Sequence, residues 1–570
     1  MFANTNNGPC RRSTMATRQR KLFVLGVLTA LALLANFCAS GFYFVANQYA
    51  YYRLLKDAGL PYEVNRAVHF HENLSLNDDP LSDKRADVQA ETARLLSMVG
   101  LTSLISGLFS SVVVGRLSDQ YGRRLAIGVV LLGQGLHNVV ILLMILLELS
   151  VTFLIFGSFL SGMVGGGMIS FIVQVNVCFT DLTRIVENSD HSPEVAGFRQ
   201  GREERRRLLL LGSFDTVIVL AAAAANSSLG SLLERFGFST SVITMVAIFL
   251  GPVTIIWLLP ETNPVLVNRI TLVPPPEAND TPCVQTDRRQ VCQRFCAMWI
   301  TMRSTAKCTL SILATHNPES LLGFSLLILY VLIVFPEGQF LFLYLMSKPF
   351  CWTPEHVGLY NGFSSLLSAG VTMLLTAITV WSMKPRANPS HLTQDPSPES
   401  DNLLSRAEDN EPVIEAIESR ATYDVLTHHV IVGRLRMMIY VFVAFLTLML
   451  SKLLLGFAFM LPNPACTQLV FVSVFLGLVR ASLVPTLKSF FSAIHPANIQ
   501  GHLFSLIGVC EYAALLVGLP GLPAVYSLTV SIFPGAVFLF TAGLAAIGCI
   551  LTGVLIYCIV IELRRCVVSS

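Results

Sequence analysis

The sequence predicts an all-α membrane protein whose twelve transmembrane helices form two six-helix bundles. Three observations support this prediction. The chain of 570 residues is 53% hydrophobic and only 13% charged, with a mean hydropathy of +0.63, which is too apolar for a soluble protein. Apolar windows of roughly 20 residues, the length that spans the hydrocarbon of a bilayer, recur about twelve times. A long polar stretch at 261–319 divides these windows into two equal groups.

Residues 22–260 are expected to form the first bundle, after a cytosolic tail at 1–21. Basic residues gather in that tail just before the first apolar window, and positive charge marks the cytosolic side of a membrane protein. A polar outer loop follows the first span. Asn73 in this loop begins the sequon Asn-Leu-Ser, an acceptor for glycosylation outside the cytosol. The expected spans are 22–46, 95–114, 125–147, 152–179, 208–232 and 239–259.

Residues 320–563 are expected to form the second bundle, between a cytosolic central linker at 261–319 and a cytosolic tail at 564–570. The loop at 384–434 is rich in Pro, Ser, Asp and Glu, a composition that cannot bury a core, so we expect it to be disordered. The expected spans of this half are 320–346, 356–383, 437–461, 467–490, 502–527 and 531–561.

The 384–434 loop also contains an acidic residue four positions before a pair of leucines. Glu399, Leu403 and Leu404 form this pattern, which is similar to the signals that sorting adaptors read on proteins bound for endosomes and lysosomes. The composition requires the lipid bilayer as a partner. We therefore expect a multi-pass protein of the plasma membrane or an endolysosomal membrane, with both termini in the cytosol.

Composition and spacing also argue against several classes of function. A net charge of +3 on a chain of this size gives no reason to expect a nucleic-acid partner. Cys283, Cys292 and Cys296 lie near one another, but their spacing matches no common zinc site and no histidine accompanies them, so we expect neither a metal nor a cofactor. No nucleophile and base, and no metal-ligand cluster, fall at a usable spacing, which argues against an enzyme.

The turn at 115–124 joins the second and third expected spans. Its glycines, including Gly122, permit a tight reversal, whereas Asp119, Arg123 and Arg124 cannot lie in hydrocarbon. An aspartate and an arginine one helical turn apart can pair. The pattern G-x-L-x-D-x-x-G-R-R resembles the signature loop of the major facilitator superfamily. This resemblance implies a transporter that works by alternating access.

Nearly all of the chain outside 384–434 resembles a narrower group, the proton-coupled folate transporter family (solute carrier family 46). The resemblance implies secondary active transport of a small organic anion together with protons. Folates are the leading substrates, and haem, muropeptides or steroid conjugates are alternatives. The stretches that carry the resemblance are 118–124, 180–183, 485–488, 501–505 and the group Tyr344, Pro349, Cys351, Trp352, Gly358 and Tyr360.

Departures from that family bear on the substrate. Its folate member has an acid in the fourth span where this chain has Gly167, and a histidine in the seventh where it has Val334. Both differences weaken a folate assignment. That member also ties its first outer loop to the cysteine at the position of Cys351, but the first loop here contains no cysteine, so a bridge from Cys351 to Cys466 is the open alternative.

Three carboxylates fall inside apolar spans, where an ionisable group is costly unless it faces water or a partner, so each is a candidate for proton coupling. Asp215 falls where the folate transporter keeps its proton-coupling acid, and a helix-end acid that balances the arginines at 205–207 is an equal alternative. Glu337 lies between a proline and a glycine that interrupt the seventh span, either to build a mid-membrane site or as a simple kink. Glu511 is a third coupling acid or the partner of a nearby cation.

Three cations fall at similar depth, and an anionic substrate requires at least one of them in its cavity. Two alignments to the family are possible in the tenth span: one matches its arginine to Arg480, and the other, which we prefer, matches it to Lys488. A lysine there offers a point charge in place of two parallel hydrogen bonds. Lys452 is expected either to contact substrate or to pair with an acid inside the bundle.

Amides in the third and fourth spans are further candidates for the cavity wall. Gln174 and Asn176 in the fourth span are candidate substrate-binding residues, and Gln134, His137 and Asn138 in the third span belong to the same group. Hydrogen bonds between helices are the alternative role for all five.

The resemblance assigns conformational gating to the signature turn. Asp119, Gly122, Arg123 and Asp181 are expected to form a charge cluster at the cytosolic face, with the start of the eleventh span adding the positive end of its dipole. Such a cluster would latch the outward-open state. A receptor or scaffold that does not transport, with the 384–434 loop as its partner-binding element, remains the alternative function.

Overall fold

The computed structural model describes residues 10–62, 80–183, 193–263, 318–382, 411–495 and 500–569. Within these ranges the regular structure is entirely helical. Asn73, Glu399, Leu403 and Leu404 lie outside the described residues, as do most of the central linker and the cysteines at 283, 292 and 296.

The first bundle contains the first six spans. The fourth span is divided between two helices at Gly166, and the fifth and sixth spans are continuous in one helix, whose backbone leaves the helical region at Gly237. Its elements are α1 (Cys10–Asp57), α2 (Pro80–Tyr121), α3 (Arg123–Leu146), α4 (Phe153–Gly165), α5 (Gly167–Thr183), α6 (Pro193–Ile255) and the 3-10 turn η1 (Ile256–Leu258).

The second bundle contains the other six spans, and two of these are interrupted by short 3-10 segments. The seventh span is α9 (Pro318–Val334), η2 (Phe335–Gln339) and α10 (Leu341–Met346), and the tenth is α13 (Ala465–Gly477), η6 (Leu478–Ser482) and α14 (Leu483–Ile494). The others are α11 (Pro354–Ser382), α12 (Glu411–Phe457) with η5 (Ala458–Met460), α15 (Gln500–Thr529) and α16 (Ala536–Ser569).

The predicted twelve-helix fold is confirmed. Ten helical runs among the described residues are long and apolar enough to cross a membrane. One of them, Gly212–Leu258, holds two spans because Gly237 divides it, and the 29-residue α11 adds another. Ten runs, one extra span and α11 together make twelve.

Several helices extend well beyond the expected spans: α2 begins at Pro80, α6 begins at Pro193, and α16 ends at Ser569, inside the tail expected at 564–570. Two further extensions reach into the expected N-terminal tail and the 384–434 loop. The first helix begins at Cys10, inside the tail expected at 1–21. Helix α12 begins at Glu411, so the last part of the 384–434 loop, expected to be disordered, is helical. Both extensions continue the helix of an adjacent apolar span, and a helix once begun adds residues easily.

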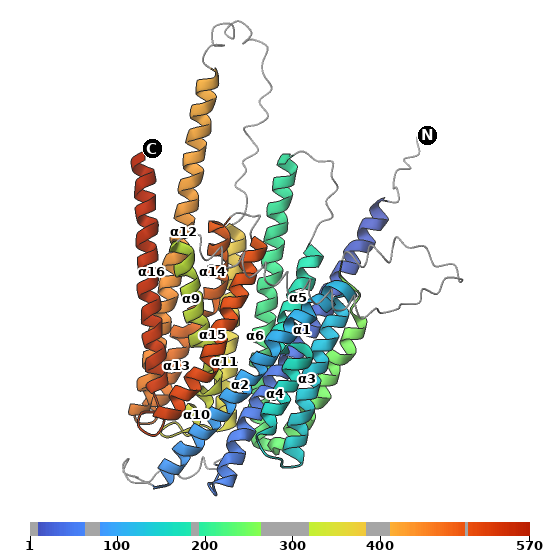
Figure 1. Cartoon of the computed structure of the whole chain (residues 1–570), viewed down its shortest axis with the longest axis vertical. Coiled ribbons are helices and arrows are strands. Elements are labelled where there is room, and N and C mark those ends of the chain that lie inside the picture. The colour runs from blue at the N-terminus through green and yellow to red at the C-terminus, as the bar shows by residue number, and fades with distance from the viewer. Residues whose placement is uncertain are drawn as a thin grey trace, which may run out of the picture.

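The two bundles stand side by side, and α1 begins and α16 ends at the same end of the molecule, here named the termini end (Figure 1). Helix α2 packs against α15 and α6 packs against α11 across the boundary between the bundles. A hydrophobic core at the opposite end includes Tyr51 and Val88 of the first bundle together with Phe340, Tyr344 and Tyr526 of the second. Burial of these side chains holds the bundles together at that end.

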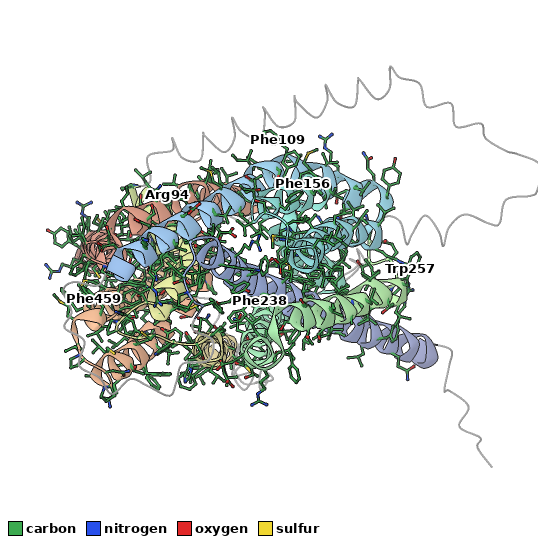
Figure 2. The ribbon with its side chains drawn as sticks, turned by 90° about the horizontal axis from the view of Figure 1, so that it is seen from below. Arg94, Phe109, Phe156, Phe238, Trp257 and Phe459 are labelled. Carbon is green, nitrogen blue, oxygen red and sulfur yellow. The ribbon has the colours of Figure 1, made fainter. Side chains whose placement is uncertain are left out.

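Large apolar side chains cover the outside of both bundles. Phe109 is 72% exposed and Trp257 is 73% exposed, and both stand at the periphery of the ribbon (Figure 2). Exposed apolar surface of this extent is expected where lipid replaces water around the helices.

Candidate functional site

A cavity of about 480 Å³ lies between the two bundles. Its first-bundle wall carries hydroxyl and amide side chains from α1 and α6, such as Asn36, Ser40 and Asn226, and it includes Met168 at the start of α5. Its second-bundle wall carries the charges, which come from η2 and η6. A central cavity with polar groups converging from two sides is the usual form of a small-molecule site.

Three charged side chains form a cluster on the second-bundle wall, here named the charge triad: Glu337, Lys452 and Arg480. Glu337 Oε2 accepts a hydrogen bond from Arg480 NH1 at 3.0 Å, and its Oε1 pairs with Lys452 Nζ. Lys452 is 1% exposed and Glu337 is 7% exposed. Buried charges are tolerated where they are paired and hydrogen-bonded in this way.

Breaks in two helices bring the triad together. Pro336 has no amide hydrogen to donate, and the helix of the seventh span tightens into η2 around it, which turns Glu337 inward. The tenth span tightens at η6, which holds Arg480. Both breaks fall near the middle of their spans, so the acid and the base meet midway along the second bundle.

The triad carries an excess of positive charge. One carboxylate lies between two cations, which leaves one positive charge uncompensated within it. Glu337 and Arg480 line the cavity, whereas Lys452 lies behind them. Arginine has five N–H donors in a planar fork, and the bond to Glu337 engages NH1, so this wall can offer further donors to a solute.

Lys488, which sequence alignment favoured for the cavity, lies elsewhere. Its Nζ pairs with Glu511 Oε1 at 3.0 Å, between α14 and α15. Asp215 on α6 interacts electrostatically with both Lys488 and Glu511. The structure therefore separates the candidate coupling acids into two groups: Glu337 in the triad, and Asp215 with Glu511 around Lys488. Asp215 belongs to the first bundle, whereas Lys488 and Glu511 belong to the second.

The amide candidates of the third and fourth spans are not among the residues that line the cavity. Gln134 Nε2 donates to Asn138 Oδ1 at 3.1 Å, and His137 packs against Gly157. Gln174 is buried in the first bundle, and Asn176 is half-buried there. The bond between Gln134 and Asn138 lies within α3, so it does not join two helices.

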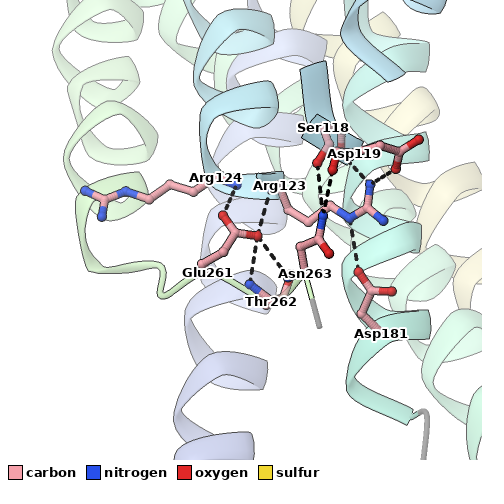
Figure 3. A network of polar contacts seen from close by, with 8 residues as sticks. All are labelled: Ser118, Asp119, Arg123, Arg124, Asp181, Glu261, Thr262 and Asn263. Carbon is pink, nitrogen blue, oxygen red and sulfur yellow. Dashed lines mark hydrogen bonds and ion pairs between the residues drawn. The ribbon is translucent and has the colours of Figure 1, made fainter. Parts of the chain in front are cut away.

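The signature turn forms a polar cluster at the termini end (Figure 3). Arg123 NH1 bonds to Asp119 Oδ1 and to Ser118 Oγ, each at 2.7 Å, and its Nε bonds to Asp181 Oδ2 at 3.0 Å. The arginine therefore ties the end of α2 to the end of α5. These bonds, and the bond from Asn263 Nδ2 to Asp119 O, join residues of the first bundle.

Glu261, which the sequence reasoning missed, completes this cluster. Its carboxylate accepts the amide hydrogens of Arg123 at 2.9 Å and Arg124 at 3.4 Å, and so caps the start of α3 (Figure 3). Gly122 allows this contact, because it adopts a φ of +110° and a Cβ there would strike the Glu261 carboxylate. Its position in the sequence, directly after the sixth apolar window, is the signal that could have identified Glu261 as part of the cluster.

The bundles contact each other closely at the end opposite the termini. Gln89 on α2 donates to Leu343 O at 3.5 Å and accepts from Tyr526 Oη at 3.2 Å. Gly230 on α6 and Gly358 on α11 stand so close that a Cβ on Gly358 would lie 3.0 Å from Cα of Gly230. These contacts hold the two bundles close together at that end. No disulfide joins Cys351 to Cys466 in the described chain.

Comparisons with known proteins agree with this architecture. No family model matches the chain. Among solved structures, a mutant of the peptide transporter POT is 14% identical with a TM-score of 0.54, and each chain is 95% covered. The same mutant with alafosfalin gives 13% identity, a TM-score of 0.53 and 95% coverage of both chains.

A third similar structure is the POT family transporter PepTSo, which is 14% identical with a TM-score of 0.51. The match covers 95% of this chain and 98% of that one. At such identities the likeness concerns the fold alone. The chain has the major facilitator fold, with twelve membrane-spanning helices in two bundles around a central cavity.

Proposed function

We propose that this protein is a secondary transporter that moves a small organic anion across a membrane by alternating access. The observation that carries the proposal is the charge triad. A cavity between two helical bundles, with one uncompensated positive charge on its wall, suits a solute that brings a negative charge.

Arg480 is the group we assign to the solute. It lines the cavity, whereas Lys452 is buried behind Glu337 and Lys488 is paired away from the cavity. A guanidinium can grip a carboxylate through two parallel hydrogen bonds. This favours a carboxylate-bearing solute, and folate or a related organic anion is the substrate class that we put forward.

Protons are the proposed driving ion. Asp215 belongs to the first bundle, and it interacts electrostatically with Lys488, which belongs to the second. Protonation of Asp215 would cancel its attraction to Lys488, and so would change how strongly the two bundles are held together at that level. Glu511 competes for the same lysine at 3.0 Å, and Glu337 holds the solute-binding arginine. These three acids are therefore our candidates for proton coupling.

The cluster around the signature turn is assigned to conformational gating. Asp119, Gly122, Arg123 and Asp181 fix the relative position of α2, α3 and α5 at the termini end. A change in this cluster alters the balance between the open states of a carrier without touching the solute, and a shift of about 1 to 3 kcal/mol is enough to slow the cycle.

The positions of the two termini support a proposal for how the protein lies in the membrane. Basic residues precede the first span, and α1 begins at the end where α16 ends, so we propose that both termini face the cytosol. Asn73 then lies in the first outer loop as a glycosylation site. Glu399, Leu403 and Leu404 remain a candidate adaptor signal that would direct the protein to an endolysosomal membrane rather than the plasma membrane.

Uptake of radiolabelled folate by cells that display the protein at their surface tests this function. We expect saturable uptake that is faster at an outer pH of about 5.5 than at about 7.4. Asp215→Asn should lose the acid stimulation, and Arg480→Gln should lose uptake at both values. Uptake that ignores the outer pH would overturn proton coupling. Absence of uptake by surface-localised protein would remove folate as the substrate.

A deletion within 384–410 distinguishes the scaffold alternative. If the protein is a transporter, the deletion removes only a sorting signal, and the uptake rate per molecule at the surface should not change. If the protein is a scaffold, the deletion should abolish partner binding, and neither the wild type nor the variant should take up solute.

A further inference from the structure

Helices α6 and α11 belong to different bundles and meet along a seam of small residues. A Cβ on Gly358 of α11 would strike Asn226 O of α6. A Cβ on Gly362, one helical turn further along α11, would lie 2.9 Å from Ala223 O. The backbones of the two helices are therefore in direct contact along this seam.

Hydrogen bonds continue the seam towards the end opposite the termini. Ser231 Oγ on α6 donates to Glu355 Oε1 on α11 at 2.8 Å, and the Glu355 amide donates to Glu234 Oε2 at 3.2 Å. Any state in which the bundles separate at that end must break these bonds and part α6 from α11.

Two asparagines line the cavity beside this seam, one from each bundle. Asn226 lies on α6 and Asn361 lies on α11, and both are half-buried. Asn361 falls between Gly358 and Gly362, and these glycines meet α6 at Asn226 and Ala223. The two asparagines therefore stand at the same level of the seam. We name them the asparagine pair.

The carboxamides of the asparagine pair are available to a solute, because neither has a hydrogen-bond partner among the described residues. Asn36 differs: it lines the same cavity on α1, but its Nδ2 donates to Ala32 O at 2.8 Å. Ser364 and Ser365 follow Asn361 by three and four positions, so they lie on the same face of α11, and both line the cavity. This wall offers hydrogen-bond donors and acceptors without charge.

We propose that the asparagine pair binds an uncharged part of the solute that both donates and accepts hydrogen bonds. This inference rests on the proposed function, in which Arg480 binds the carboxylate of the solute. The solute class we assign is a carboxylate that carries an amide, or neighbouring hydroxyl groups, away from its charge. A cavity of about 480 Å³ has room for a molecule that reaches both Arg480 and the asparagine pair.

Binding at the asparagine pair also links recognition to the conformation of the carrier. One asparagine belongs to each bundle, so both can bind the same group only while α6 and α11 remain in contact. A ligand that binds one state more tightly shifts the balance towards that state. A solute with the uncharged group should therefore hold the seam closed, whereas a carboxylate that lacks this group should not.

Thermal unfolding of the purified full-length protein, titrated with two matched pairs of carboxylates, tests the assignment. The first pair is 4-carbamoylbenzoate and 4-isopropylbenzoate, which are similar in shape. The second is quinate and cyclohexanecarboxylate, which differ by the ring hydroxyls. We expect the polar member of at least one pair to bind about tenfold more tightly than its apolar partner. The pair that shows this preference distinguishes an amide from hydroxyl groups.

Variants of the asparagine pair locate the preference. Asn226→Leu and Asn361→Leu remove the hydrogen bonds at similar volume, so each should remove most of the preference and leave binding of the apolar carboxylate unchanged. Arg480→Gln should weaken both members of a pair. Asn138→Leu makes the same change on α3, outside the cavity, and should leave the preference intact.

Spin labels test the link to conformation. Arg235 on α6 and His356 on α11 are exposed positions near the outer part of the seam, and labels there report its width. The preferred polar carboxylate should shorten the mean distance between the labels, and its apolar partner should not. Asn361→Leu should abolish this effect.

Three results overturn the inference. One is equal binding of both members in both pairs. Another is a preference that both asparagine variants leave intact, and the third is a label distance that the preferred carboxylate does not change. Each of these counts against the asparagine pair alone. Absence of binding by all four carboxylates would contradict the proposed function together with this inference.

Discussion

Glu337 and Arg480 come from the seventh and tenth spans, and they pair at 3.0 Å where both helices are interrupted. The same carboxylate also pairs with Lys452, which is buried behind it. One acid therefore holds two bases, and only one of these bases lines the cavity. This arrangement separates a structural cation from a cation that can bind a solute.

Removal of the acid should destabilise the protein through the buried lysine. Glu337→Gln leaves Lys452 charged and unpaired, and loss of one partner of a buried pair costs about 3 kcal/mol. The double variant Glu337→Gln with Lys452→Met removes both charges and should recover most of the loss. Unfolding in detergent measures both. Equal stability of the single and double variants would contradict the pairing.

The two cations of the tenth span should have different kinetic roles. Arg480→Gln should raise the KM for an anionic solute by about tenfold or more at every pH, because it removes a charged hydrogen-bond donor from the cavity. Arg480→Lys should restore part of the affinity, since charge remains but the planar fork does not. Lys488→Gln should leave KM near wild type and change the pH dependence of uptake. A large KM effect of Lys488→Gln alone would reverse the assignment.

Glu261 should stabilise the start of α3. Glu261→Ala removes the acceptor for the Arg123 and Arg124 amides, and loss of such a helix cap costs about 1 kcal/mol. A lower Tm of the purified protein would report the loss. Glu355→Ala, which removes an acceptor from the opposite end of the molecule, serves as a control for detergent effects. If Glu261→Ala unfolds like wild type, the cap contributes nothing.

Acid should weaken one ion pair at the end opposite the termini. Lys56 and Arg53 bond to Glu148 at 3.0 and 3.1 Å, and these bonds, with Lys56 first, hold the pKa of Glu148 below its ordinary value of 4.5. A lowered pKa means that the stabilisation is complete above 4.5 and is lost as the pH falls through the folded value. Glu148→Gln should therefore match wild type in strong acid and differ from it above 4.5. Added salt should reduce the difference, since the pair is exposed.

Contact between the bundles should depend on Gly358. A Cβ at this position would strike Asn226 O and approach Cα of Gly230. Gly358→Ala should therefore separate α6 from α11 and favour states that are open at this end. Spin labels on the outer ends of these two helices would show a longer mean distance in the variant. Gly370→Ala on the same helix has open space around it and should leave the distance unchanged.

Hydropathy and charge were sufficient to predict the twelve spans, because each apolar window must cross the bilayer as a helix. The four-residue spacing of Asp119 and Arg123 likewise predicted a contact within one helical turn, and these residues bond at 2.7 Å. Such features are local, so they can be read from neighbouring residues in the chain.

The arrangement of the cavity could not be predicted in the same way. Whether Arg480 or Lys488 faces the solute depends on how the tenth helix is rotated, and η6 changes that rotation between the two residues. The pairing of Glu337 with Lys452 joins residues more than a hundred positions apart.

Exchange of radiolabelled folate in proteoliposomes that contain only this protein tests the central claim most directly. If the protein is an anion carrier with Arg480 at its site, unlabelled folate or another organic anion inside the vesicles should accelerate entry of the label, and Arg480→Gln should abolish this acceleration. If wild-type vesicles exchange neither folate nor any other organic anion of a test panel faster than empty vesicles, the proposal of an anion carrier is contradicted.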